Sequence, residues 1–573
     1  MRSPVLPKPG WPAPWISALS HLLLLSLLAL ASFVLFASTA CLAEPVRLEQ
    51  LEDSLVAFQK DAQDAYDRGD YAASVSAYEE ILDTLDLALF PDRAAGLLYN
   101  FACSAALAKR PELALHALEM ASAAGWRNLD HLARDPDLDS LRDTPAYAAL
   151  VAQMERDAAL EARAWGSPSL ETPYQEDLST EEKVAGLSRL WMEAKLNFAF
   201  FDQVPDLDWD AEYLATLPRV MKSRSTKEYY RILSALVAKL EDGHTGVVYP
   251  RELFEQVYSK PPVRTSLIEG QVLVTGIMNP DVTGLAVGDE VVSIDGVPVK
   301  TYAEEQIRPY VCASTPQDRD NRTYDYELLL GPSGRSVQLG VREGDGTTRT
   351  VVLDRGMEWK HDRPLVEHEL LGDGIGYLAI HTFAGDAPVD SLVSLAMTEL
   401  RGARALVIDI RENGGGNSGW WVMEHLVDEY ELTVWSTRQY RAAFRAWGRA
   451  QPWYESSPTS RRTADPSRIF GGPVVLLTSP RTFSAAEDFA AVFKWSGRGE
   501  VVGEPTGGST GQPLFFRLPG GGSARICTKR DTYPDGSEFV GYGVQPDVVV
   551  HPTIKGCRSG KDVVLEAAVK LLK

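Results

Sequence analysis

Hydrophobic positions along the chain change their spacing several times, and each change predicts a different kind of element. From about Leu48 to Met154 apolar residues recur at helical spacing, which predicts helical hairpins within residues 44–164. Residues 165–178 are rich in Ser, Pro, Thr and acidic residues and are interpreted as a linker. Helical spacing returns from Ser179 to Leu240 and gives way to a β-like run, so residues 179–250 are predicted to form a helical bundle.

The rest of the chain is predicted to contain strands. Between residues 251 and 355 short apolar runs alternate with Gly turns, which is typical of a small β domain. In residues 356–573 short β-branched runs alternate with helical segments, and this order predicts a mainly parallel sheet covered on both faces. The expected strands are Ile375–Ile380, Ala405–Ile410, Val474–Thr478 and Glu500–Gly503. The fold class is therefore a multidomain protein that combines α+β and α/β parts.

The N-terminal segment has the pattern of a targeting sequence. Arg2 and Lys8 precede an apolar run from about Leu22 to Phe36, and small residues follow at Ala37–Ala43. We interpret residues 1–43 as a signal peptide for export to the periplasm or the extracellular space. An uncleaved membrane anchor and a lipidated Cys41 are the alternatives.

Net charge and cysteine content limit the partners. A formal net charge of −22 argues against nucleic acid or anionic lipid. Beyond the leader lie Cys103, Cys312, Cys527 and Cys557, and in an oxidising compartment the most plausible disulfide is Cys527–Cys557, with free buried thiols as the alternative. Because there is no CxxC motif and no His/Cys cluster, we predict no metal and no cofactor.

Ser484 is the candidate nucleophile. It lies in Thr482–Phe489 (TFSAAEDF), shortly after the apolar run Val474–Thr478. A strand that ends at a serine and turns directly into a helix exposes the hydroxyl and points free N–H groups, here that of Ala485, at the attacked atom. The alternative is a serine that only caps the helix.

A glycine-rich turn supplies a second candidate for the oxyanion hole. The predicted strand Ala405–Ile410 runs into Arg411–Gly419 (RENGGGNSG), where consecutive glycines allow close approach of the backbone to a ligand. A phosphate loop would need a Gly-Lys-Ser/Thr sequence, which is absent here. We therefore predict the Gly415 N–H as the second oxyanion donor.

These motifs, together with Glu504–Gln512 (EPTGGSTGQ) and Gly541–Asp547 (GYGVQPD), resemble in their order those of the C-terminal-processing (tail-specific) serine peptidases. The resemblance extends from about Ser179 to the C-terminus. It implies a crotonase/ClpP-like α/β peptidase core over residues 356–573 and acylation of a serine by peptide substrates.

Two further resemblances concern the accessory parts of the chain. Residues 66–74 and 97–103 resemble tetratricopeptide (TPR) repeats, which implies a concave face for a protein partner, with a plain helical packing module as the alternative. Residues 284–299 resemble the core hairpin of a PDZ domain, which implies binding of extended peptides by strand addition. The alternative is a β insert that serves as a spacer.

The general base distinguishes two branches of the resembled family. One branch uses a lysine in the glycine-rich loop, but Ser509 occupies that place here, and Lys494 belongs to the predicted helix. The other branch, which includes the tricorn core and retinoid-binding repeats, places a histidine in the turn found here at Leu240–Thr245. We therefore predict His244 as general base, with His381 as the alternative.

At the orienting residues of the relay the chain departs from the resembled pattern. Tricorn-like enzymes have a serine before the histidine, where this chain has Gly243. Glu538 is the candidate for the late glutamate of that branch, although Val540 stands at the family's site. Glu487, one helical turn after Ser484, is the alternative partner.

The resulting hypothesis is an exported serine endopeptidase that cleaves extended or unfolded polypeptides through a Ser484–His244 relay. Its partners would be polypeptide substrates and a protein bound by the repeat region, and no nucleic acid. The alternative is a non-catalytic protein that binds a peptide or a lipid-like ligand on a decayed peptidase fold. The oligomeric state does not follow from the sequence.

Overall fold

The computed structural model describes residues 48–87, 90–166, 168–360, 363–384, 389–438, 446–448, 454–456 and 460–573. The chain divides into two compact units, one ending at Leu160 and the other running from Glu161 to Lys573. The predicted leader, residues 1–43, lies outside the described residues. Among the described helices none is long and apolar enough to span a bilayer.

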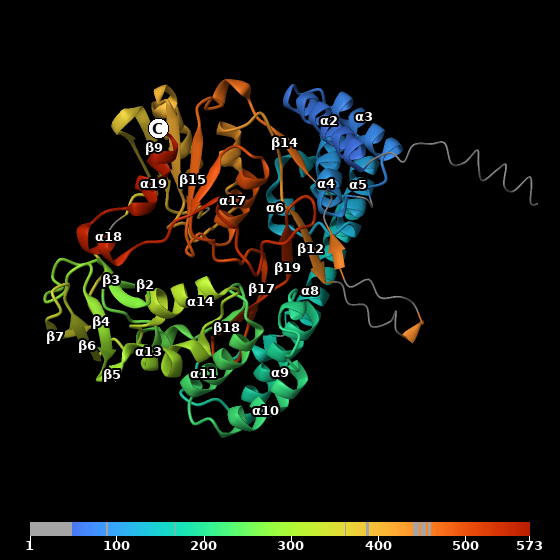
Figure 1. Cartoon of the computed structure of the whole chain (residues 1–573). Coiled ribbons are helices and arrows are strands. Elements are labelled where there is room, and N and C mark those ends of the chain that lie inside the picture. The colour runs from blue at the N-terminus through green and yellow to red at the C-terminus, as the bar shows by residue number, and fades with distance from the viewer. Residues whose placement is uncertain are drawn as a thin grey trace, which may run out of the picture. The chain divides into compact units, whose positions relative to one another are not determined.

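The first unit consists of helices, as the sequence predicts. Helices α2 and α3 pack together, and so do α4 and α5 (Figure 1). Small side chains allow this close packing, because Ala102, Ala105, Ala114 and Ala117 are completely buried. The helices are α2 (Leu48–Asp67), α3 (Tyr71–Thr84), α4 (Pro91–Leu107), α5 (Pro111–Ala123), α6 (Leu129–Arg134), α7 (Asp139–Arg142) and α8 (Pro145–Trp165).

The second unit begins with a bundle of three helices: α9 (Thr180–Asn197), α10 (Trp209–Lys222) and α11 (Thr226–Val237). Ser179 starts α9 with a capping box, in which its hydroxyl accepts from the Glu182 N–H and the Glu182 carboxylate accepts from the Ser179 N–H. The apolar faces of the bundle share one core with the sheet described below. A short 3-10 turn, η5 (Ala238–Leu240), leads from α11 to His244.

An antiparallel sheet and short helices follow the bundle. The strand order is β2-β3-β4-β6-β7, with β5 paired to β4 through the Asp295–Gly296 turn, so β2 is an edge strand. We call residues 251–355 the β-rich segment. Its elements include β2 (Val263–Ile268), β3 (Gln271–Ile277), β4 (Glu290–Ile294), β5 (Val297–Pro298), α13 (Val299–Tyr302), α14 (Pro316–Asn321), β6 (Ser336–Arg342) and β7 (Thr348–Asp354).

The C-terminal part forms a six-stranded sheet in the order β20-β16-β15-β10-β9-β8, parallel except for β8. Separate apolar clusters cover its two faces, which confirms the prediction of a buried parallel sheet. Its strands are β8 (Val366–Leu371), β9 (Ile375–Ile380), β10 (Ala405–Asp409), β15 (Val474–Thr478), β16 (Glu500–Gly503) and β20 (Val548–Val549), and its helices include α15 (Val389–Glu399), α17 (Ala485–Trp495), α18 (Ile554–Ser559) and α19 (Val563–Leu571).

A small second sheet joins the bundle to the C-terminal part. Strand β1 (Gly246–Val248) begins two residues after His244 and pairs antiparallel with β18 (Ser523–Cys527), which also pairs with β17 (Pro513–Arg517). The Cys527 N–H donates to Thr245 Oγ1 at 3.1 Å, so the bonding continues to the residue next to His244. The position of His244 is therefore fixed by backbone pairing with a strand from the far end of the sequence.

The four cysteines beyond the leader are free thiols, which is one of the two alternatives left open by the sequence, and Cys527 is not bonded to Cys557. Cys527 Sγ is buried and contacts the Thr510 and Lys529 carbonyls. Cys557 Sγ, on α18, instead lies 3.9 Å from the Val274 carbonyl of the β-rich segment. Tertiary packing thus gives each sulfur a different neighbour.

Alkylation of the denatured protein without reductant tests this assignment. We expect iodoacetamide to modify Cys103, Cys312, Cys527 and Cys557, because all four are free. Peptide mass spectrometry measures the modification, and a sample reduced before alkylation is the control. A Cys527–Cys557 cross-linked peptide in the unreduced sample would contradict the structure.

Candidate active site

Ser484 stands between β15 and α17 in a strained backbone conformation. Its φ is 57° and its ψ is −128°, in a region that side-chain-bearing residues rarely adopt. A serine on such a sharp strand-to-helix turn presents its hydroxyl at the end of a sheet, as nucleophilic serines do. Figure 1 shows α17 beside β15.

Backbone hydrogen bonds to two other loops hold the strained turn in place. The Phe483 N–H donates to the Asn413 carbonyl at 3.1 Å, and the Ser484 N–H donates to the Ser509 carbonyl at 3.1 Å. The Gly507 N–H donates to the Thr482 carbonyl at 3.0 Å. The Ser484 turn is thus fixed between the loop after β10 and the loop after β16.

His244 lies 240 positions before Ser484 in the chain, and the fold brings the two side chains into contact. Its Nε2 lies 3.0 Å from Ser484 Oγ, and its ring stacks on Phe483 at 4.8 Å between centroids. The side chain is 5% exposed. Burial first, and then the charges of Arg525, Arg322 and Lys529, lower the pKa of His244 to about 3, so the imidazole is neutral at neutral pH.

The second ring nitrogen of His244 contacts Ser509, which the sequence analysis did not assign to the relay. His244 Nδ1 lies 2.7 Å from Ser509 Oγ, and that hydroxyl lies 3.4 Å from Asp242 Oδ1. Asp242 Oδ2 accepts from the His244 N–H at 3.1 Å. A signal was present in the sequence, since Asp242 belongs to the histidine turn and Ser509 occupies the lysine position of the other branch.

Glu538 is not the partner of His244, so this prediction is wrong. Its carboxylate lies 3.3 Å from Arg530 Nη1, and it lines a separate cavity of about 780 Å³ beside Trp495 and Tyr533. Ser509 Oγ contacts His244 Nδ1, the ring nitrogen that Glu538 would have to reach in order to orient the imidazole. Glu538 therefore lies in an exposed loop and forms an ion pair with Arg530.

The prediction for Gly415 also needs correction. Its N–H donates to Asn413 Oδ1 at 2.9 Å and is not free to bind an oxyanion. Glycine is needed for close approach, because a Cβ at this position would lie 2.7 Å from Ser484 Cβ and 2.9 Å from the Ala485 nitrogen. Its φ of 95° also favours glycine.

Glu487 supports the loop that carries Ser509 and does not contact His244. Its buried carboxylate accepts from the Gly508 N–H at 2.6 Å and from the Ser509 N–H at 2.8 Å. Burial raises the pKa of Glu487 to about 8, although hydrogen bonds from Thr506, Ser509 and Gly508 oppose the shift. The glutamate one turn into α17 therefore ties the helix to the loop after β16.

The remaining candidate bases lie elsewhere. His381 follows β9, with Nε2 3.3 Å from the Glu367 carboxylate, and burial lowers its pKa. Lys494 Nζ donates to Asp547 Oδ1 at 2.5 Å, on the outward part of α17. His244 is thus the histidine in hydrogen-bond contact with Ser484.

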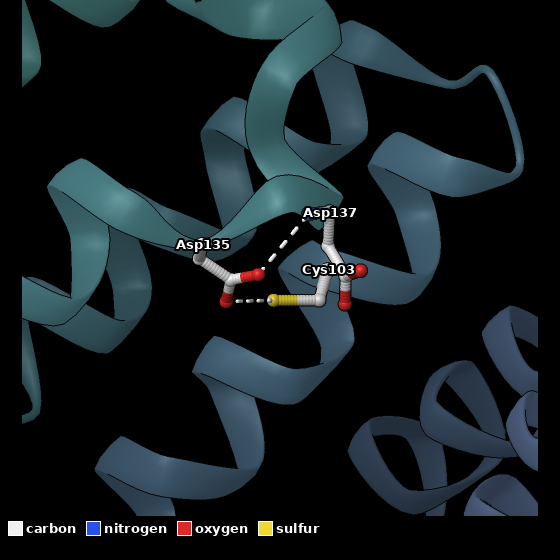
Figure 2. A group of neighbouring side chains, drawn as sticks. All are labelled: Cys103, Asp135 and Asp137. Carbon is white, nitrogen blue, oxygen red and sulfur yellow. Dashed lines mark hydrogen bonds between the residues drawn. The ribbon is translucent and has the colours of Figure 1, made fainter.

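Within the part of the chain that the structure describes, one group of potential metal ligands occurs, and it lies in the first unit. Cys103 lies near Asp135 and Asp137 (Figure 2), but their oxygens already have hydrogen-bond donors. Asp135 accepts from Tyr99 OH at 2.6 Å and from the Asp137 N–H at 3.1 Å, and Asp137 accepts from Tyr66 OH at 2.5 Å. These bonds fasten the turn after α6 to its neighbours, and no ligand is needed to explain the group.

Comparison with known proteins places the chain among peptidases. Residues 374–550 match the family model of peptidase family S41. The carboxyl-terminal-processing protease of Picosynechococcus is 24% identical over 385 residues, which cover 62% of this chain and 81% of the relative. The chloroplastic C-terminal processing peptidase of Tetradesmus obliquus is 30% identical over 47% of this chain and 54% of its own length.

A longer relative and a solved structure are also similar to this chain. A tricorn protease homologue of Streptomyces coelicolor is 27% identical over 64% of this chain, and the match spans 30% of that protein. The crystal structure of mature CPAF has a TM-score of 0.54 at 16% identity and covers 69% of this chain and 97% of CPAF, which shows a shared fold. Residues 374–550 are therefore a peptidase family S41 domain, and the similarity of the chain to C-terminal-processing proteases extends beyond that domain.

Proposed function

We propose that this peptidase is an exported serine endopeptidase in which Ser484 is the nucleophile and His244 the general base. The observation that carries the proposal is the 3.0 Å contact between His244 Nε2 and Ser484 Oγ. The strained turn at Ser484 and the stacking of His244 on Phe483 both restrain this geometry.

The proton transfers follow from the neutral state of His244. Unprotonated Nε2 accepts the Ser484 proton as Oγ bonds to the scissile carbonyl carbon. The resulting imidazolium gives that proton to the leaving amine, and an acyl-enzyme remains. Water then attacks the ester with the same histidine as base, which releases the second product and restores Ser484.

The Ala485 N–H is the proposed oxyanion donor. Ala485 is the first residue of α17, and the first N–H groups of a helix have no acceptor within the helix. The partial positive charge of the helix N-terminus adds to the stabilisation of a developing oxyanion. Gly415 lies close to this N–H, and a Cβ at position 415 would come within 2.9 Å of the Ala485 nitrogen.

The proposed substrate is an extended or unfolded polypeptide. Strand β2 is an edge strand, and its residues Ser266–Ile268, together with Glu269, line a cavity of about 890 Å³. The same cavity is lined by Ser479–Arg481, just before Ser484. A substrate strand added to β2 in PDZ fashion would thus lie near the nucleophile.

Export and a protein partner for the repeat-like helices remain parts of the proposal, carried by the leader and by the pattern of residues 66–103. A non-catalytic binder is the second hypothesis, to which Gly243 and Val540 pointed. The hydrogen bond between Ser484 and His244 favours the enzyme, because a binder has no use for an activated serine.

Replacement of the nucleophile tests the chemistry directly. Ser484→Ala is expected to lower kcat/KM on an unfolded fluorogenic polypeptide by about 10³-fold or more, because the acylated atom is lost. Labelling by a fluorophosphonate probe is expected to disappear with it. Ser391→Ala on the exposed face of α15 is the matched control and should keep both signals. Equal hydrolysis by Ser484→Ala and wild type would refute the assignment.

Separate replacement of His244 and of His381 tests which of the two histidines is the general base. His244→Gln is expected to lower kcat/KM by about 10²–10⁴-fold, the range for a lost general base. His381→Gln should retain nearly the wild-type value, since His381 contacts Glu367. Steady-state kinetics of both variants decides the point, and the reverse order of effects would make His381 the base.

Because the pKa of His244 is lowered to about 3, kcat/KM is expected to depend little on pH in mildly acidic solution. The base acts when neutral, so activity is lost only as pH falls through its folded pKa of about 3. We expect kcat/KM to change little between about pH 8 and about pH 5, where a histidine of pKa about 6.5 would lose about 30-fold. Circular dichroism at each pH checks the fold.

Glu487 titrates at the alkaline end of this pH range, which is why the fold is checked at each pH. Its pKa is raised to about 8, so its contribution to folding is present at low pH and is lost as pH rises through that value. A sigmoid loss of kcat/KM centred near the ordinary histidine pKa of about 6.5 in folded protein would contradict the predicted environment of His244.

A further inference from the structure

The surroundings of His244 create a problem for its role as base. Arg525 and Arg322 both approach the Gly243 carbonyl, at 3.2 and 3.5 Å, and with Lys529 they disfavour the imidazolium. The proposed mechanism nevertheless forms an imidazolium in its transition states. A compensating negative charge with access to the ring is therefore required.

We propose that Ser509 and Asp242 form a positioning pair that completes the relay, in the order Ser484, His244, Ser509, Asp242. This inference rests on the proposed function and names the residues that fix the tautomer of the base. Ser509 Oγ is 2.7 Å from His244 Nδ1 and 3.4 Å from Asp242 Oδ1. The Ser509 hydroxyl thus links His244 Nδ1 by hydrogen bonds to the Asp242 carboxylate, which does not itself contact Nδ1.

The direction of the hydrogen bonds sets the tautomer. If Ser509 donates to Asp242, its oxygen accepts from Nδ1–H, and Nε2 is left unprotonated toward Ser484. When Nε2 gains the serine proton, both donors in the chain already point toward Asp242. The long Ser509–Asp242 contact is expected to shorten when the imidazolium forms.

Asp242 is surrounded by donors. Oδ1 accepts from the Ser314 hydroxyl at 3.3 Å as well as from Ser509, and Oδ2 accepts from the His244 N–H. Burial raises the pKa of Asp242 above its ordinary value, and hydrogen bonds from Thr245, the charge of Arg525 and the Ser314 hydroxyl offset only part of that shift. Both oxygens of Asp242 thus act as hydrogen-bond acceptors, which is the role that the positioning pair requires of them.

The position of Ser509 is fixed by groups other than His244. The Ser509 N–H donates to Glu487, and its carbonyl accepts from the Ser484 N–H. On the other side of the ring, a Cβ at Gly243 would lie 2.9 Å from the Phe483 ring and 3.1 Å from Arg322 Nη2. The hydroxyl that orients His244 therefore has to come from the loop after β16.

Asp242→Asn tests the carboxylate with minimal change of shape. If the new amide nitrogen faces Ser509, it donates to the hydroxyl and favours a Ser509 O–H bond to Nδ1, which places the ring proton on Nε2. If the amide nitrogen takes the place of Oδ2 instead, two donors face each other, because the His244 N–H donates to that position in the wild type. We expect kcat to fall by about 10²–10⁴-fold with KM little changed, because only the base is affected.

Ser509 is tested by a pair of substitutions. Ser509→Ala removes the hydroxyl and is expected to lower kcat by about 10²-fold, whereas Ser509→Thr keeps a hydroxyl and should recover most of that loss. A purely structural role predicts that both variants lose activity in step with melting temperature. Glu538→Gln is the control and should match the wild type, since Glu538 pairs with Arg530.

A spectroscopic arm is independent of turnover. In histidine-labelled protein, ¹⁵N chemical shifts report which ring nitrogen carries the proton, and His244→Gln identifies the signals of His244. We expect Nδ1 to be protonated in the wild type and Nε2 to gain protonation in Asp242→Asn. This arm applies even if a variant is inactive.

The outcomes separate the two proposals. Absence of hydrolysis and of Ser484 labelling in the wild type would defeat the proposed function while the ¹⁵N shifts still decide the tautomer. An active wild type in which Ser509→Ala and Asp242→Asn keep kcat would overturn the positioning pair alone. Protonation of His244 on Nε2 in the wild type would also overturn it.

Discussion

The hydrogen bond between His244 Nε2 and Ser484 Oγ is the interaction on which the rest of the site depends, and backbone pairing maintains it. Strand β1 begins two residues after His244 and pairs with β18, so the histidine turn belongs to the sheet structure of the C-terminal part. Ser484 is held by bonds to the loops after β10 and β16. Rigid backbone thus places two flexible side chains within contact distance.

The β-rich segment participates in the same network and does more than fill space. Ser314 contacts Asp242, and Thr315 Oγ1 donates to the Gly507 carbonyl at 2.8 Å. Arg322 lies over the Phe483 ring, on which His244 also stacks. Displacement of this segment would therefore be felt at both the histidine turn and the loop of Ser509. The β-rich segment, which includes the edge strand β2, is thus bonded to the turn and the loop that surround His244.

Several parts of this arrangement follow from local sequence and others do not. The Val474–Thr478 run is apolar at every position but the last and is followed by TFSAAED, so a buried strand that ends at an exposed serine and a helix could be predicted. Glu538 was chosen by its order in the chain, but its turn pairs with Arg530. The Gly415 prediction failed because the Asn413 side chain accepts a hydrogen bond from that N–H, a contact that the glycine-rich sequence does not reveal.

The sequence by itself determined the four central strands of the parallel sheet, the helical segments, the strand-to-helix turn at Ser484 and the histidine turn, because periodicity and turn residues act over a few neighbours. Tertiary structure alone decided which hydroxyl and which carboxylate lie beside the ring of His244. Ser509 and Asp242 are 267 positions apart, and their contact depends on the pairing of β1 with β18 and on the Glu487 clamp. No local pattern encodes such a meeting, because it results from packing of the whole second unit.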